Sequence, residues 1–153
     1  MDMPTPTDGH RKFAKLAGNW KGEEKMYPSN WDPKGGTAVA KLNSRIDLSG
    51  FAMLSDYIQE REGKVTFTGH SVTTFDPKED LYSMHWFDCM GSHPEVFRGK
   101  FTGDRLVVSH GGPGMHARMT YDLSDPAKMT AKMEMSQDGK EWKTLFDGSY
   151  TKS

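Results

Sequence analysis

The chain lacks several features that define large classes of proteins. Its single cysteine, Cys89, cannot form an intrachain disulfide, which favours a reducing, cytoplasmic setting. No window approaches the ~18 consecutive apolar residues of a membrane-spanning helix, and the polar N-terminus does not resemble a signal peptide. The net charge is −1, with both signs interspersed. This pattern predicts neither a nucleic-acid partner nor binding to an anionic membrane.

Helical signal is also scarce. Residues 1–8 are expected to form a flexible tail. Residues 9–17 then carry apolar side chains at helical spacing, and Gly18 supplies a stop. No second segment of this kind and no repeat follows, so we expect residues 9–153 to form one domain.

The rest of the chain consists of short runs in which apolar and polar residues alternate, bounded by Gly, Pro, Asp or Asn. Ten strands are predicted, at residues 19–27, 37–48, 51–59, 64–75, 81–90, 95–102, 105–110, 115–123, 129–135 and 141–150. Tight turns between successive strands favour an antiparallel meander, and a meander of this length removes its exposed edges by closing on itself. The expected fold is therefore all-β: an antiparallel up-and-down β-barrel with one short N-terminal helix.

Side chains alternate between the inside and outside of a barrel. If the more apolar face of each strand points inward, the lining includes Trp20, Gly22, Glu24, Met26, Tyr82, Met84, Trp86, Asp88, Met90, Met115, Ala117, Met119, Tyr121, Met129, Ala131, Met133, Met135, Trp142, Thr144, Phe146, Gly148 and Tyr150. Many of the eleven methionines fall on this face. Methionine either fills irregular gaps in a core or forms a deformable pocket wall, and both readings stay open.

Two carboxylates, Glu24 and Asp88, share the expected inward face. Burying a carboxylate is costly unless it has a partner. The candidate partners are Arg98, Lys100 and Arg118. The alternative is that a β-bulge shifts the facing by one residue, which would turn these carboxylates outward.

Four short motifs resemble one family, in the right order along the chain. They are the "leucine, small, glycine, x, tryptophan, x, glycine" opening at 16–22, the strand end at 69–76, the "tryptophan, x, aspartate, x, methionine, glycine" motif at 86–91, and the ending at 138–144. They resemble the family called domain of unknown function 1579. The resemblance implies a lipocalin-like (calycin) barrel, a bacterial origin and no established activity. It also implies that Trp20 closes one end of the barrel, often against an arginine from a late strand.

A neighbouring family, the nitrobindin-like haem barrels, shares this opening, including a "tyrosine, proline" pair that is Tyr27-Pro28 here. Its haem ligand is a histidine on the last strand. Residues 145–150 contain no histidine, so nothing there can ligate haem iron, and we expect no cofactor.

Motifs for chemistry are weak. No GxSxG elbow or HExxH pair is present. His85 and Cys89 lie four residues apart on one strand, too far apart for one metal ion unless a bulge intervenes. His93, His110 and His116 lie in or beside loops, and the sequence leaves open whether they converge at the barrel mouth. We predict no catalytic and no metal-ligating residue, and a metal-binding barrel stays an alternative.

The favoured hypothesis is binding of a small apolar or amphipathic molecule inside the barrel. The expected ligand-binding residues are Trp86, Asp88, Tyr82, Met84, Met119, Arg118, Met133, Phe146 and Glu24, with Asp88 and Arg118 as polar anchors. One alternative is an isomerase- or cyclase-type enzyme that uses the same lumen. Another is an interaction protein whose barrel is filled by its own side chains. A homodimer is compatible with each.

Overall fold

Ten strands follow one another along the chain, as the alternating pattern predicts. They are seen in a computed structural model, which describes residues 1–91 and 93–153. The strands are β1 (Gly18–Met26), β2 (Gly36–Asp47), β3 (Ala52–Arg61), β4 (Lys64–Asp76), β5 (Leu81–Asp88), β6 (Glu95–Thr102), β7 (Arg105–Gly112), β8 (Met115–Asp122), β9 (Lys128–Ser136) and β10 (Lys143–Lys152). One 3-10 turn, η1 (Leu48–Gly50), connects β2 to β3.

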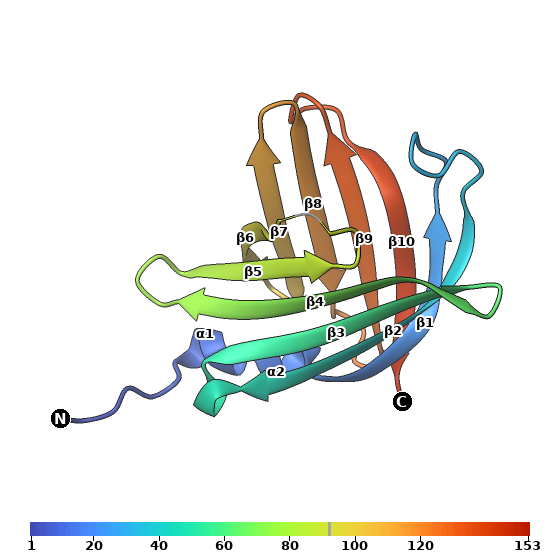
Figure 1. Cartoon of the computed structure of the whole chain (residues 1–153). Helices are drawn as coiled ribbons and strands as arrows, with labels where there is room; N and C mark the ends of the chain where they lie inside the picture. Colours follow the sequence, from blue (N-terminus) through green and yellow to red (C-terminus); the bar gives the residue numbers. More distant parts are fainter. Residues whose placement is uncertain (92) are drawn as a thin grey trace.

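Each strand pairs antiparallel with its neighbours in sequence, and β1 pairs with β10, so the sheet closes into a barrel (Figure 1). The closing register runs from Trp20 opposite Lys152 to Met26 opposite Phe146. Closure gives each of these ten strands two hydrogen-bonded partners, so none of them presents a free edge to another molecule. The expectation of an all-β, up-and-down antiparallel barrel with a short N-terminal helix is confirmed.

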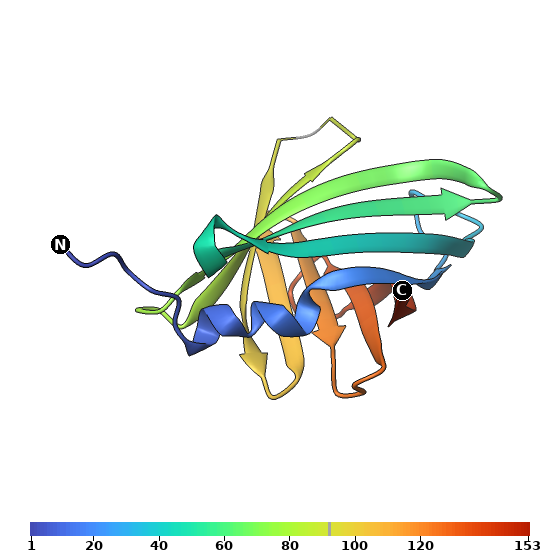
Figure 2. The same ribbon diagram turned by 90° about the horizontal axis from the view of Figure 1, so that it is seen from below.

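The helical segment forms where it is predicted, but in two turns. These are α1 (Asp8–Arg11) and α2 (Phe13–Leu16), which meet at Lys12. Thr7 caps the segment because its backbone N–H donates to His10 Nδ1 at 3.0 Å. Figure 2 shows the two helices crossing one end of the barrel. Neither of them is long enough to span a bilayer, which takes ~20 apolar residues.

Apolar side chains fill the barrel end under the helices, which we call the closed end. Tyr82 lies at its centre, with ring centroids 5.8 Å from Phe13, 4.6 Å from Phe75 and 5.3 Å from Phe101. Its hydroxyl donates to the Gly9 carbonyl at 2.5 Å, which ties the helical segment to β5. Phe13 is fully buried there. The closed end therefore has the close packing of an ordinary protein core.

Trp20 also lies at the closed end, as the family resemblance implies. Its indole N–H donates to the Leu16 carbonyl at 2.8 Å, which satisfies the one polar atom of a buried ring. The cation over the ring is Lys152, 5.1 Å from the ring centroid, in place of the expected arginine. Trp20 thus joins the end of α2 to the first and last strands.

The expected facing holds over most of the strands. In β1, for example, Trp20 and Glu24 are buried while Lys21, Glu23 and Lys25 are exposed. The facing is wrong for Met90, which is 73% exposed because β5 ends two residues earlier. Met115, at the first position of β8, is likewise exposed.

A β-bulge at the start of β10 turns outward two residues that the sequence analysis places inside the barrel, Trp142 and Thr144. The pairing with β9 slips between Thr144 and Phe146, so one extra residue, Leu145, enters the strand. Because a one-residue slip reverses every side chain beyond it, Thr144 pairs opposite Glu134, on the outer face of β9. Trp142 also lies outside, where the Arg118 guanidinium carbon stacks over the indole, 4.0 Å from the Trp142 ring centroid. Phe146, Gly148 and Tyr150 keep their expected inward positions.

Candidate functional site

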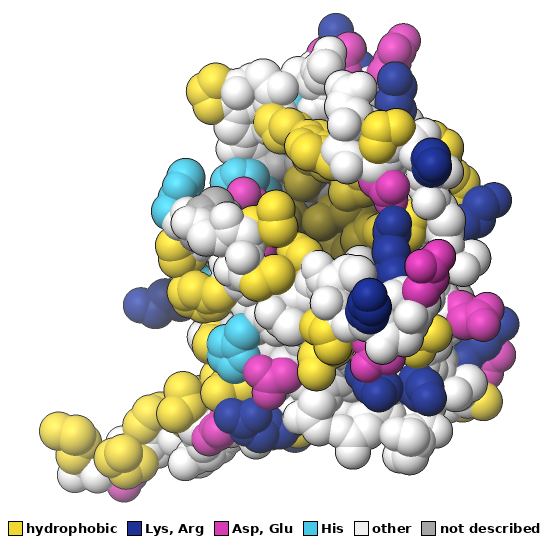
Figure 3. All heavy atoms as spheres, turned by 45° about the vertical axis from the view of Figure 1, so that its right-hand side comes forward, with side chains coloured by type: hydrophobic (Ala, Val, Ile, Leu, Met, Phe, Trp, Pro, Cys, Tyr) yellow, Lys and Arg dark blue, Asp and Glu magenta, His cyan; other side chains and the backbone are white. Residues whose placement is uncertain are grey.

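The barrel encloses a cavity of about 330 Å³ beyond the closed end. Figure 3 shows it as a hollow, walled mainly by hydrophobic side chains, that reaches the surface. We call the part of the barrel around this hollow the open end. The volume lies at the lower limit of typical small-molecule sites, roughly 300–1,000 Å³.

Methionines form much of the wall. Six of the eleven line the cavity: Met26, Met53, Met84, Met119, Met129 and Met133. They come from five different strands, so thioethers surround the space from several sides. Methionine side chains adapt their rotamers at low cost, so this wall can follow the shape of a flexible guest.

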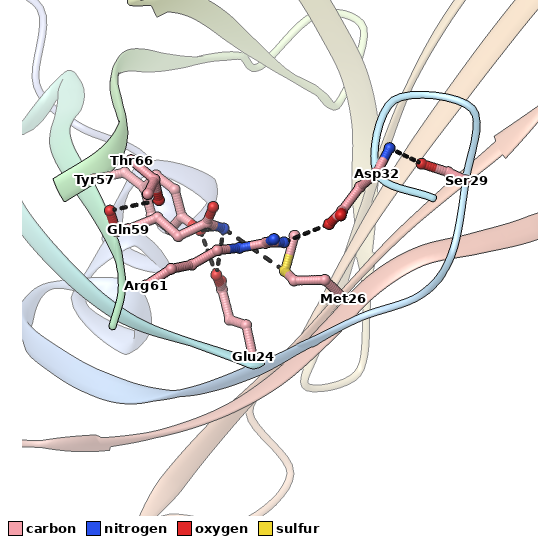
Figure 4. A network of polar contacts seen from close by, with 8 residues as sticks. All are labelled: Glu24, Met26, Ser29, Asp32, Tyr57, Gln59, Arg61 and Thr66. Atoms are coloured by element: carbon pink, nitrogen blue, oxygen red, sulfur yellow. Dashed lines mark hydrogen bonds and ion pairs between the residues drawn. The ribbon is translucent and has the colours of Figure 1, made fainter. Parts of the chain in front are cut away.

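One carboxyl group, that of Glu24, reaches the cavity from β1 although the residue is only 1% exposed. Three donors converge on it: the hydroxyls of Tyr57 and Tyr150, each at 2.5 Å, and the Gln59 amide at 2.9 Å. Figure 4 shows Tyr57 and Gln59 reaching Glu24 from β3. We call these four residues the Glu24 cluster. Its hydrogen bonds satisfy a buried acid that would otherwise be costly.

A glycine makes room for this cluster. Gly148 lies opposite Glu24 in the β1–β10 register. A Cβ at this position would overlap the Tyr150 hydroxyl and come within 2.9 Å of Glu24 Cγ. The absence of a side chain on β10 therefore lets the Tyr150 hydroxyl meet the carboxyl group.

The tyrosines of the cluster act as donors throughout the physiological pH range. Burial, followed by the nearby Glu24 charge, raises the pKa of both Tyr57 and Tyr150 above the usual value of 10.0. The same two causes raise the pKa of Tyr121, which also lines the cavity. These phenols therefore stay neutral and present O–H groups.

Three aromatic rings line the cavity near the Glu24 cluster. Their centroids are separated by 6.0 Å for Tyr57–Phe67, 6.2 Å for Tyr57–Trp86 and 6.4 Å for Phe67–Trp86. We call them the open-end aromatics. Gly69 allows this arrangement, because a Cβ there would overlap the Trp86 ring. The Trp86 N–H donates to Asp88 at 2.8 Å, which holds the indole in place.

The charged residues that line the cavity are all acidic. They are Glu24, Asp88 and Glu95, and among residues 1–91 and 93–153 no lysine, arginine or histidine lines it. Asp88 accepts the Trp86 N–H and the Met90 backbone N–H at 2.9 Å. The nearby Arg61 points past Met26 to Asp32, with which it pairs at 2.5 Å (Figure 4). That hydrogen bond holds the pKa of Asp32 below its usual range.

Seven of the nine residues predicted to bind ligand line the cavity: Trp86, Asp88, Met84, Met119, Met133, Phe146 and Glu24. Tyr82 does not, because it belongs to the packed closed end. Arg118 does not either. It lies between the inward-facing Ala117 and Met119 on β8, so its side chain faces outward and pairs with Glu134 at 3.1 Å.

The expected pairing of the inward carboxylates with basic residues is also wrong. Glu24 has tyrosine and glutamine partners, and Asp88 has the Trp86 indole. Neither carboxylate shows an ion pair within the part of the chain that the structure describes, so Arg98, Lys100 and Arg118 are not their partners. Within the described residues Glu24 and Asp88 do not hydrogen-bond each other either, so each carboxylate belongs to a separate polar group.

Sequence reasoning did not single out Tyr57, Gln59 or Phe67. Tyr57 and Gln59 alternate with exposed residues on β3, so a period-two pattern is present. The polar Gln59 and Ser55 make this face hard to recognise as inward. The inward position of Phe67 is harder still to predict, because the irregular β3–β4 pairing beside Gln59 shifts the register of β4 by one residue.

The histidines do not form a metal site in the described part of the chain. Within residues 1–91 and 93–153, no three His, Cys, Asp or Glu side chains are grouped so that they could hold an ion. His110 Nδ1 donates to the Val96 carbonyl at 3.1 Å, and the His116 ring lies 6.5 Å from the Trp142 ring. His93 is exposed.

Comparison with known proteins identifies a family and a fold. The model of a family described as "Protein of unknown function (DUF1579)" matches residues 5–152. The crystal structure of Rv2717c from M. tuberculosis is similar, with a TM-score of 0.71 and 11% sequence identity, covering 96% of this chain and 98% of that chain. At this identity the likeness shows the fold alone. No curated protein matches the sequence.

Proposed function

We propose that this chain, which belongs to the DUF1579 family of proteins of unknown function, binds a small apolar or amphipathic molecule inside its barrel. The observation that carries the proposal is the cavity of about 330 Å³, lined by six methionines and by aromatic side chains. Apolar side chains that face an open cavity forgo the burial they would gain against other side chains. A guest of matching shape would restore those contacts and remove apolar surface from water.

The polar groups of the wall allow the guest to be amphipathic as well as purely apolar. The Glu24 cluster provides hydroxyl and carboxyl groups within the cavity, and Asp88 and Glu95 provide carboxylates on β5 and β6. Binding sites for small molecules commonly combine an apolar body with a few fixed polar groups of this kind. The protein would therefore act as a carrier or sensor.

Saturable binding of pyrene, a neutral fluorophore whose emission reports polarity, tests this proposal. We expect one pyrene per chain, with an emission spectrum typical of an apolar site. The variant Ala131→Phe should abolish binding, because Ala131 lines the cavity and a phenyl ring there would fill much of it.

The matched control is Thr130→Phe, the same new side chain one residue earlier on β9. Thr130 is exposed on the outer face, so this variant should bind pyrene as the unmodified protein does. Pyrene binding that does not saturate, or that is equally strong in Ala131→Phe, would overturn the proposal.

A further inference from the structure

The electrostatic character of the cavity restricts the guest beyond its size. All ionisable side chains in the described lining are carboxylic acids or tyrosines. Burial keeps the tyrosines neutral, so the side chains of this lining are either neutral or acidic. An anionic guest such as a fatty acid would lose its hydration and meet no cation. That loss is expensive in a medium of low polarity.

Glu24 adds to the acidic character of the cavity. A carboxylate 1% exposed has only neutral donors around it: two hydroxyls and one amide. Hydrogen bonds satisfy its lone pairs, but no positive charge compensates it within the described residues. A cation in the cavity would supply that charge.

A cation site in this cavity would combine acidic side chains with aromatic rings, and the open-end aromatics provide the rings. Tyr57, Phe67 and Trp86 present π-faces or edges to one part of the cavity, within 6.0–6.4 Å of one another. Cations bind to the electron-rich faces of such rings, most strongly to tryptophan. Glu95 pairs directly opposite Trp86, and Asp88 lies two residues along the same face of β5. Aromatic faces and carboxylates thus lie side by side.

We infer that the cavity takes an amphipathic cation: an amine or quaternary ammonium group between the open-end aromatics and the carboxylates of Asp88 and Glu95, with its apolar tail among the methionines. This inference rests on the proposed function. The wall sets the orientation of the guest. The methionines contact its tail, and its head group lies where the aromatic rings and the acidic side chains are adjacent.

Three probes with the same tail separate charge from size. Decylamine is a cation at pH 7, decanol is neutral and decanoate is an anion. Each is titrated as a competitor of bound pyrene. We expect decylamine to bind about tenfold more tightly than decanol, the size of one cation–π contact combined with one ion pair, and decanoate to bind most weakly.

Charge-removing variants locate the head group. Glu95→Gln and Asp88→Asn should each reduce the ratio of decylamine to decanol affinity severalfold, and Trp86→Leu should reduce it as well. Glu23→Gln is the matched control, because Glu23 lies on the outer face of β1 and loses the same charge. It should leave the ratio unchanged. Because the ratio is measured within one variant, a general loss of affinity does not imitate the effect.

The outcomes separate the two proposals. If pyrene binds but decanoate competes as well as decylamine, or decanol and decylamine compete equally, the cation inference is wrong and the carrier proposal stands. If pyrene binds and none of the three competes, the cation inference is also wrong. If pyrene itself does not bind, the proposed function fails and the inference fails with it. A ratio unaffected by Glu95→Gln and Asp88→Asn would overturn the assigned head-group position.

Discussion

The two ends of this barrel contain similar residues, but these residues are closely packed at one end and border a cavity at the other. Each has a cluster of aromatic rings from neighbouring strands, with a tyrosine whose hydroxyl donates a short hydrogen bond. At the closed end Tyr82 bonds a backbone carbonyl of the helical segment, and its ring is packed on several sides. At the open end Tyr57 bonds a buried carboxyl group, and its ring faces a cavity. The helical segment makes the difference, because it covers only one end.

This contrast assigns different tasks to the same side-chain types. The closed end has rings packed on several sides and ties the helical segment to the strands. The open end leaves apolar surface unpacked, which costs stability that close packing would supply. Such local loss of packing is typical of sites that receive a ligand. Experiments that damage one end at a time can therefore test whether stability and binding are separated in this way.

The largest difference should come from removing one phenyl ring at each end. Phe13→Ala should lower the free energy of unfolding by about 3–5 kcal/mol, because it leaves a void in a fully buried position. Phe67→Ala should cost only about 1–2 kcal/mol, because the ring already borders a cavity that its removal merely enlarges. Urea titrations of both variants measure this difference.

Pyrene affinity gives the complementary measurement on the same two variants. Phe67→Ala should weaken pyrene binding, whereas Phe13→Ala should leave it nearly unchanged at temperatures where the variant is folded. If Phe13→Ala collapses the fold, Phe13→Leu provides a milder loss of volume. Equal destabilisation by Phe13→Ala and Phe67→Ala would show that the two ends do not differ as described.

A second comparison adds one methyl group at each end. Gly9 lies under the Phe75 ring at the closed end, and Gly69 lies under the Trp86 ring at the open end. In both cases a Cβ would overlap the ring. Gly9→Ala should cost about 2 kcal/mol, since Phe75 already packs against the rings of His10 and Tyr82 and has to disturb those contacts to make room.

Gly69→Ala should cost less than about 1 kcal/mol, because Trp86 can turn into the cavity. That movement should instead weaken pyrene binding and change the tryptophan fluorescence. Thermal unfolding together with pyrene titration distinguishes the two variants. A Gly69→Ala protein with unchanged pyrene affinity would mean that Trp86 does not shape the cavity.

The sequence predicts the barrel well because its signal is repeated. Ten alternating runs, each bounded by turn residues, point to the same fold, so an error of two residues in one run does not alter the outcome. It predicts the closed end less well. Tyr82 shares its face of β5 with Met84 and Trp86, and only the position of the helices decides which of these residues is packed and which borders a cavity.

The open end shows a different limit. Tyr57, Gln59 and Tyr150 are brought to Glu24 from two other strands, at sequence separations of 33, 35 and 126 residues. A local sequence pattern cannot predict contacts between residues so far apart in the chain. Bulges add to the difficulty, since one extra residue in β10 reverses the side chains before it. The expected arginine partners of Glu24 follow from a sound rule, that buried acids need partners, but tyrosine hydroxyls meet that need equally well.

The smallest expected effect is a difference in how the tyrosines of the two ends ionise. Burial raises the pKa of Tyr82 to about 12, with a smaller contribution from Asp80. For Tyr57 and Tyr150 the Glu24 charge adds to burial. Because these pKa values are higher in the folded chain, the stability that they contribute is complete below pH ~10 and is lost as the pH rises further. Alkaline unfolding should therefore accompany tyrosine ionisation.

The variant Glu24→Gln removes the charge but keeps the shape of the side chain. Tyr57 and Tyr150 should then ionise at a lower pH than in the unmodified protein, although still above the usual value, because burial remains the larger cause. Tyr82 should be unaffected, because Glu24 does not contribute to its shift. Tyrosinate absorbance followed against pH measures both groups. If Glu24→Gln leaves the whole titration unchanged, the charge of Glu24 does not act on the open end, and the contrast between the ends reduces to packing alone.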